Sequence, residues 1–150
     1  MIQITRIDAN NNDLRQLVNK LDVELAGLDG DEHPFYAQFN KIDAIKFAVL
    51  AYENEVALGC GAIKEYEPGI MEIKRMYVIP AKRGIGVASA ILHELEKWAK
   101  ELGFEKCILE TGKRQAAAIG LYLKQGYVQI PNYGQYKDVT NSLCFEKRLL

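Results

Sequence analysis

The sequence predicts a single α/β domain, residues 1–150, with a mixed, mostly antiparallel sheet of about seven strands flanked by about four helices. Three observations lead to this fold class. The first half contains three strand-like runs joined by short turns, which is typical of an antiparallel meander. The second half alternates strand and helix patterns, which indicates parallel crossovers. A chain of 150 residues with 49% hydrophobic residues is long and apolar enough for one full core.

Hydrophobic periodicity locates the elements of the first half. Period-two alternation predicts strands, and leucines spaced at helical intervals after a run of asparagines predict an amphipathic helix. In chain order these patterns predict a strand over 2–7, a helix over 14–25, a loop over 27–34, a helical turn over 35–39, and strands over 47–52, 56–65 and 70–78. Gly59 and Gly61, inside one predicted strand, indicate a bulge or close backbone packing.

The second half begins with a long helix whose apolar residues follow the i, i+3, i+4, i+7 rule, and Gly103 is its expected C′ residue. Shorter strand and helix patterns then alternate. The resulting elements are a helix over 86–102, a strand over 106–111, a helix over 115–125, a strand over 127–130, a polar loop over 131–141 and a last strand over 142–149.

Composition excludes several classes of function. A net charge of −1 and a pI near 6.1 argue against a nucleic acid or an anionic membrane as partner. We expect no signal peptide, and no run approaches the roughly 20 apolar residues of a membrane span. The three cysteines are far apart and lack metal-ligand spacing, so we expect buried thiols, no metal site and a cytoplasmic protein.

The strand over 70–78 carries charges where a central strand should be apolar. Strict alternation would place Glu72, Lys74, Met76 and Val78 on one face and Ile73, Arg75 and Tyr77 on the other. Buried charges are costly unless they are paired or line a cavity. Two interpretations follow: the charges pair with neighbouring strands at a sheet edge, or Glu72 faces an open cleft and transfers protons.

The segment after this strand has three interpretations. A P-loop requires Gly-Lys-Ser/Thr, and Gly86 is followed by Val87 instead. A dinucleotide fingerprint requires a third glycine where Ser89 stands, although Glu110 after the next strand could bind a ribose, so this minor alternative stays open. The third interpretation is a helix start made of small residues that holds a diphosphate through backbone N–H groups.

Two motifs favour the third interpretation. Arg83-x-x-Gly86-x-Ala88, after Met76-Tyr77-Val78-Ile79-Pro80, resembles the acyl-coenzyme A motif of the GNAT N-acetyltransferase superfamily. Leu121-Tyr122, followed by Gly126-Tyr127, resembles a second signature of that family. The predicted order of strands and helices is also similar to the GNAT fold, so the resemblance covers nearly the whole chain.

This resemblance implies an acyltransferase that uses acetyl-coenzyme A, with direct attack of an amine in a ternary complex. In the family, the pantetheine arm pairs with the strand at positions matching Met76 and Val78, where a bulge turns a backbone N–H toward the thioester carbonyl. Glu72 matches the general-base position and Tyr122 the general-acid position. The residues expected at the cofactor are Met76, Tyr77, Val78, Arg83, Gly84, Ile85, Gly86, Val87, Ala88 and Gln115, the last where many members carry asparagine.

The acceptor implied by the resemblance is a primary amine of a small molecule, an amino acid or a peptide. Tyr36, Tyr133 and Tyr136 lie in segments that would flank its cleft and could select it. The alternatives are a non-catalytic acyl-coenzyme A-binding module, and an acyltransferase with another donor or acceptor. The sequence leaves the identity of the amine and a homodimer through the last strands open.

Overall fold

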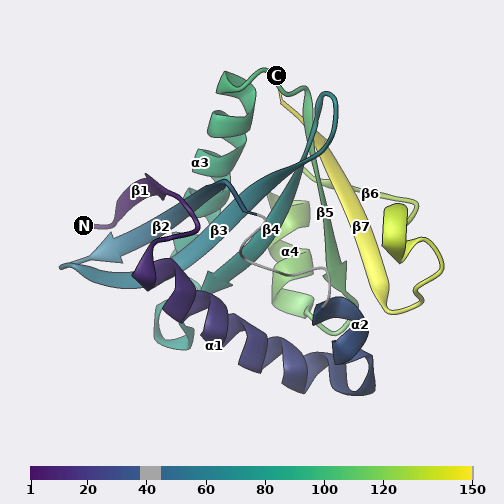
Figure 1. Ribbon diagram of the computed structural model, residues 1–150, viewed down its shortest axis with the longest axis horizontal. Helices are drawn as coiled ribbons and strands as arrows, with labels where there is room; N and C mark the ends of the chain where they lie inside the picture. The colour runs from purple at the N-terminus through teal and green to yellow at the C-terminus, as the bar shows by residue number, and fades with distance from the viewer. Residues whose placement is uncertain (38–44, 150) are drawn as a thin grey trace.

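The structure is a computed structural model, and it describes residues 1–37 and 45–149. In chain order its elements are β1 (Gln3–Ile7), α1 (Asn12–Asp29), the 3-10 turn η1 (Gly30–Glu32), α2 (His33–Ala37), β2 (Phe47–Glu53), β3 (Val56–Glu67), β4 (Ile70–Val78), η3 (Pro80–Lys82), α3 (Val87–Glu101), β5 (Lys106–Gly112), α4 (Ala116–Lys124), β6 (Val128–Ile130), η4 (Gly134–Tyr136) and β7 (Ser142–Arg148). Figure 1 shows these elements arranged around one twisted sheet.

The sheet has seven strands in the order β1-β2-β3-β4-β5-β7-β6. The described strands pair antiparallel except β4 and β5, which are parallel and connected through α3. These pairings confirm the predicted mixed, mostly antiparallel sheet and its first crossover. The second crossover differs from a simple βαβ unit because β7 lies between β5 and β6.

The helices cover both faces of the sheet, with α1 on one face and α3 and α4 on the other (Figure 1). The helix α1 begins at the N-cap Asn11, whose side chain accepts a hydrogen bond from the Leu14 N–H, and it packs on the sheet through its buried apolar stripe. The helix α3 buries Ile91, Leu92, Leu95 and Ala99 completely. The apolar face that helical periodicity predicted for α3 is therefore the face that packs in the core.

The two glycines of β3 allow α3 to approach the sheet closely. A Cβ on Gly59 would lie 2.8 Å from the backbone oxygen of Tyr77, and one on Gly61 would lie 2.8 Å from Ile91 and Leu95. The pairing of β3 with β2 also shifts register beside Gly59, because Ala51 and Tyr52 lie opposite Gly59 and Ala57 and β3 thus has one extra residue there. Both meanings of the glycine pair, a bulge and close packing, are thus confirmed.

The predicted loop over 27–34 is wrong. The helix α1 continues to Asp29, and after η1 the chain enters α2, which begins before the predicted turn. A distant residue stabilises the last turn of α1, since Arg114 Nη1 donates to the backbone oxygens of Leu28 at 2.8 Å and Asp29 at 3.3 Å. Local composition cannot show such a contact. The helical turn predicted over 35–39 is present as α2, apart from residues 38–39, which lie outside the described residues.

Candidate active site

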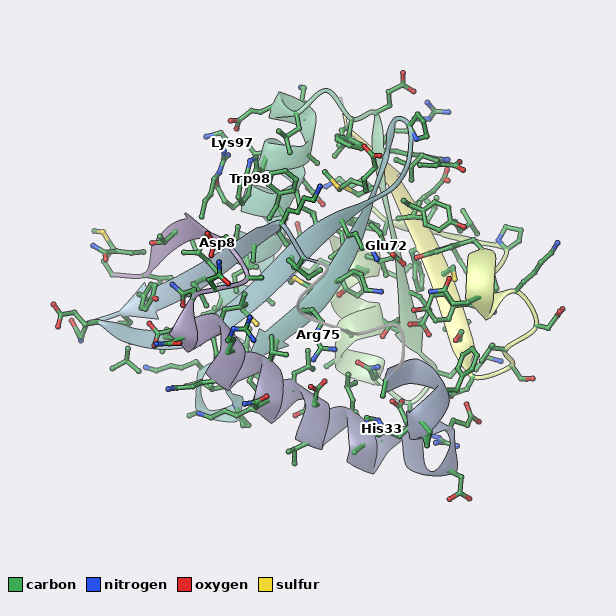
Figure 2. All side chains as sticks on the ribbon, in the orientation of Figure 1. Asp8, His33, Glu72, Arg75, Lys97 and Trp98 are labelled. Carbon is green, nitrogen blue, oxygen red and sulfur yellow. The ribbon has the colours of Figure 1, made fainter. Side chains whose placement is uncertain are left out.

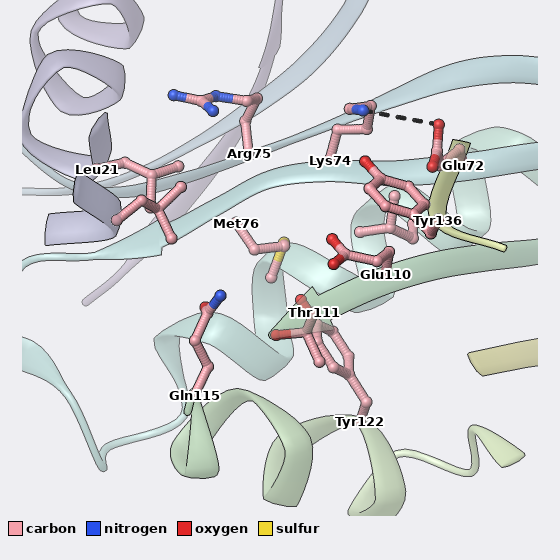
Figure 3. Close-up of a pocket in the computed structure, with 12 residues that line it drawn as sticks. Leu21, Glu72, Lys74, Arg75, Met76, Glu110, Thr111, Gln115, Tyr122 and Tyr136 are labelled. Carbon is pink, nitrogen blue, oxygen red and sulfur yellow. Dashed lines mark ion pairs between the residues drawn. The ribbon is translucent and has the colours of Figure 1, made fainter. Parts of the chain in front are cut away.

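The strands β4 and β5 separate in the middle of the sheet. They pair at three positions, from Ile70 opposite Lys106 to Glu72 opposite Ile108, although β4 continues to Val78 and β5 to Gly112. A pocket of about 80 Å³ opens at this separation, and Figure 3 shows its lining: Leu21, Leu25, Glu72, Ile73, Lys74, Arg75, Met76, Glu110, Thr111, Gln115, Tyr122 and Tyr136. Since α1 and α4 cover opposite faces and both line it, the pocket passes through the sheet.

A bulge at Arg75 shapes the wall of this pocket. Arg75 has φ +57°, and the register moves there from Lys74 opposite Ala62 to Tyr77 opposite Cys60. A non-glycine residue adopts this backbone only where its surroundings hold it. Here the Cys60 thiol donates to the Arg75 backbone oxygen at 3.3 Å, and the buried guanidinium bonds Asp22 of α1.

The bulge corrects the predicted assignment of side chains to faces. Figure 2 shows Arg75 directed toward α1, with Glu72 further along the same strand. The registers place Glu72 and Lys74 on the α1 face too, because they lie opposite Lys64 and Ala62 and Ala62 packs against α1. The α1 face of β4 therefore carries Glu72, Lys74, Arg75 and Tyr77, and the α3 face carries Ile73, Met76 and Val78. Strict alternation failed because one extra residue enters the strand.

Glu72 is buried and lines the pocket. Its side chain is 8% exposed, and its Oε2 accepts a hydrogen bond of 2.6 Å from the Tyr133 hydroxyl. The ammonium of Lys74, whose side chain is 9% exposed, lies 3.8 Å from its Oε1. Burial lowers the pKa of Lys74. The ion pair joins two residues of β4 itself, and β4 is central in the sheet, so the interpretation of pairing with neighbouring strands at a sheet edge is wrong. Glu72 lines the pocket, as the second interpretation expected, and its role in proton transfer stays a prediction.

Glu110 of β5 is a second carboxyl in the pocket. Its Oε2 accepts a hydrogen bond of 2.6 Å from the Ser142 hydroxyl, and burial raises its pKa to about 7. The sequence hypothesis considered this residue only as a ribose ligand. Its place beside Glu72 depends on the register of β4 and β5, although a glutamate after the apolar run 107–109 was the available signal.

Tyr122 enters the pocket from α4, on the opposite face of the sheet from α1 (Figure 3). Its ring packs edge-on against Tyr127 at 5.7 Å between centroids. Burial raises the pKa of its hydroxyl, and the Glu110 carboxyl adds to this effect, so the phenol stays protonated at neutral pH. Gln115 is the N-cap residue of α4 and lines the same pocket.

The glycine-containing loop leads from β4 into α3. Gly84 has φ +82° and Gly86 has φ +91°, which side chains with a Cβ rarely adopt. A Cβ at either glycine would meet no atom within 4 Å, so the backbone conformation rather than space requires glycine. Ile85 is exposed, Val87 is buried, and Ala88 packs against the core beside it. Gly86 is the N-cap of α3 and offers no side chain to its first N–H groups, which can therefore bind an anion.

Arg83 anchors this loop to the rest of the fold. Its Nε donates to the Val78 backbone oxygen at 2.8 Å, and its Nη2 bonds Glu24 of α1 at 2.7 Å. The guanidinium also lies over the Tyr77 ring, 5.5 Å from its centroid. The structure therefore gives Arg83 a role in positioning the loop, and its contact with a cofactor stays a prediction.

The tyrosines predicted at the acceptor cleft divide into two groups. Tyr136 lines the pocket, and Tyr133 bonds Glu72 while packing edge-on against Tyr136 and Tyr66. Burial raises the pKa of both Tyr133 and Tyr136, so both hydroxyls are protonated at neutral pH. Tyr36 belongs to α2, but its side chain lies outside the described part of the chain.

Three further features bear on the kind of site. In the described ranges, no group of three or more His, Cys, Asp or Glu side chains could hold a metal ion. Cys60, Cys107 and Cys144 are buried free thiols. Over the same residues, no helix combines the length and the apolar character that a membrane crossing requires.

Comparisons with known proteins agree with this geometry. The family model described as Acetyltransferase (GNAT) family matches residues 13–127. The IAA acetyltransferase of Azospirillum brasilense is 37% identical over 137 residues, which is 89% of each chain. A proposed acyl-CoA N-acyltransferase of Klebsiella pneumoniae has a crystal structure with a TM-score of 0.84 and 30% identity, covering 100% of this chain and 99% of that one.

A GNAT acetyltransferase of Elizabethkingia anophelis, crystallised with acetyl-CoA bound, has a TM-score of 0.74 over 99% of this chain and 98% of that one. At 18% identity this likeness concerns the fold alone. The family match and the identity to the Azospirillum protein go further than the fold. On these grounds the chain belongs to the GNAT acetyltransferase family and is an acyltransferase enzyme.

Proposed function

We propose that the protein transfers an acetyl group from acetyl-coenzyme A to a primary amine of a small molecule, an amino acid or a peptide, by direct attack in a ternary complex. The observation that carries this proposal is the pocket through the sheet, which two carboxyls enter on the α1 face and the Tyr122 phenol enters from α4. Such a passage lets a donor and an acceptor meet from opposite faces with proton-transferring groups on either side.

The residues around the pocket fit acetyl-coenzyme A, which supplies an acetyl group activated as a thioester. The loop from Arg83 to Ala88 offers an open helix start to the diphosphate, with Gly84 and Gly86 keeping side chains away. The backbone of Met76, Tyr77 and Val78 does not pair with β5 and can bind an extended arm, and Gln115 lies in the same pocket. The bulge at Arg75, directly before these residues, agrees with the feature expected from the family resemblance.

Two proton transfers accompany the proposed reaction. An alkyl ammonium has a pKa near ~10, so the acceptor must lose a proton before it can attack. In our proposal Glu72 is the carboxylate that receives this proton, directly or through a water. It lies on the α1 face of the sheet, where we place the acceptor, at the position where the pairing of β4 with β5 ends. Tyr122, held protonated by burial, gives its proton to the leaving thiolate.

The experiment is a thermal unfolding series with acetyl-coenzyme A, followed by an assay of released thiol with amine acceptors. A ligand at 100 times its dissociation constant should stabilise the fold by about 2.7 kcal/mol. Glu72→Gln should then move the pH–rate profile to higher pH, because the amine loses its proton to solvent. Glu65→Gln, an exposed glutamate on β3, is the matched control and should leave the profile unchanged. No stabilisation at millimolar acetyl-coenzyme A would contradict the proposed function.

A further inference from the structure

The acceptor side of the pocket contains a cation with little compensation. The Lys74 side chain is 9% exposed, and among the hydrogen bonds and ion pairs of the described residues it has the ion pair with Glu72 at 3.8 Å and no hydrogen bond. Burial is the largest influence on its pKa, which is lowered in spite of Glu72 and Glu110 nearby. The ammonium of Lys74 is removed from water and has one long ion pair, so its N–H groups can donate hydrogen bonds to an anionic group of a ligand.

Glu110, in the same pocket, is a half-buried acidic group whose charge is also only partly compensated. In the described part of the chain, the Ser142 hydroxyl donates a hydrogen bond to one carboxyl oxygen of Glu110. No ion pair within 4.0 Å joins Glu110 to Lys74 in these residues, although they come from adjacent strands (Figure 3). The carboxylate form of Glu110 is disfavoured by burial, which a cationic group of a ligand would offset.

We propose that the acceptor is a free α-amino acid, whose amino group lies against the Glu72 and Glu110 carboxyls and whose carboxylate accepts a hydrogen bond from Lys74. This inference rests on the proposed function and names its substrate class. The amino and carboxylate groups of an α-amino acid are joined through one carbon, so they lie as close together as the opposite charges in this pocket. A simple amine would bring no second anion to Lys74, whose ion pair with Glu72 is 3.8 Å long.

Three other lining residues agree with this assignment. Leu21 and Leu25 of α1 form an apolar wall, which suits an aliphatic side chain on the amino acid. Arg75 adds a second buried cation to the pocket lining, and its Nε has no hydrogen-bond partner in the described structure. The attraction of these cations offsets part of the cost of taking a carboxylate of the acceptor out of water.

The test measures thiol release with three matched acceptors: leucine, leucinamide, which lacks the negative charge, and 3-methylbutylamine, which lacks the whole carboxylate. We expect kcat/KM for leucine to exceed that of the other two by about tenfold or more, as one charge-assisted hydrogen bond would give. Lys74→Met should bring the ratio of leucine to leucinamide close to one, and Lys74→Arg should restore most of it. Lys64→Met is the matched control, since this exposed lysine lies opposite Glu72 on β3.

The outcomes separate this inference from the proposed function. Turnover of leucinamide or the amine at rates equal to leucine would overturn the amino-acid inference and leave acetyl transfer standing. A Lys74→Met variant that loses all three acceptors equally would do the same, provided that its melting temperature and its stabilisation by acetyl-coenzyme A match those of the wild type. No thiol release with the three acceptors or with the other standard amino acids would overturn the amino-acid inference, and a further lack of stabilisation by millimolar acetyl-coenzyme A would overturn the proposed function as well.

Discussion

Glu110 carries a charge that the fold does not compensate, and this gives a prediction about stability. Its pKa is raised from 4.5 to about 7, chiefly by burial, so the protonated carboxyl is the form that the folded state prefers. The resulting stability is present below pH 4.5 and is lost as the pH rises toward 7. Glu110→Gln removes this loss, because an amide stays neutral and its oxygen can still accept the Ser142 hydroxyl.

The size of the effect follows from the shift in pKa. A difference between 4.5 and about 7 corresponds to about 3 kcal/mol when the pH exceeds both values. At pH 5 most of the wild-type carboxyl is still protonated, and the variant gains less than about 1 kcal/mol. In a domain of this size, 1 kcal/mol shifts the melting temperature by roughly 2–4 °C. We therefore expect Glu110→Gln to melt about 6–12 °C above the wild type at pH 8.

The assay is thermal unfolding of both proteins in matched buffers from pH 5 to pH 8, without ligand. The measurement at pH 5 is the internal control, because both side chains are then mostly neutral. A difference in melting temperature that stays constant over this range would refute the argument, since an effect of altered packing or hydrogen bonding would not depend on pH. We also expect the stabilised variant to lose turnover with amine acceptors, as residues kept for function often reduce stability.

Three further substitutions test the cofactor loop, the proton donor and the packing of β3. Gly86→Val should abolish the stabilisation by acetyl-coenzyme A, because a β-branched residue does not adopt φ +91°; an unchanged melting shift would mean that the loop is not the diphosphate site. Tyr122→Phe should lower kcat by about 10²-fold while the acetyl-coenzyme A stabilisation persists, and equal kcat values would require another proton donor. Gly59→Ala should destabilise the fold by about 1–3 kcal/mol in denaturant titration, because its Cβ would lie 2.8 Å from the Tyr77 backbone oxygen.

Features with a local, periodic signal could be predicted from the sequence. The stripe through Ile91, Leu92 and Leu95 predicted α3 and its buried face, and Gly103, which has φ +91°, ends that helix as expected. The loop between β4 and α3 was recognisable because its glycines stand at fixed positions in the motif. In each case the residues that carry the signal are also the residues that form the structure.

Features that depend on distant contacts could not be predicted in this way. The last turn of α1 is held by Arg114, which is far along the chain, and composition alone suggested a loop there. Glu110 became a candidate site residue only because the register places it near Glu72 and Lys74. A single glutamate at the end of a strand does not by itself indicate a functional site. The hydrogen bond from Tyr133 to Glu72 likewise joins two segments with no local pattern in common.

The bulge at Arg75 has the largest consequence for the site, and no residue type in this segment predicted it. Arginine has no preference for a positive φ, so the conformation is imposed by Cys60, Asp22 and the register of β3. Without the extra residue, Met76 would face the same side as Glu72 and Lys74. With it, the polar half of β4 faces α1, where we place the amino-acid acceptor, and Met76 and Val78 face α3 and the start of the cofactor loop. One strained residue therefore separates the proposed donor side from the proposed acceptor side within a single strand.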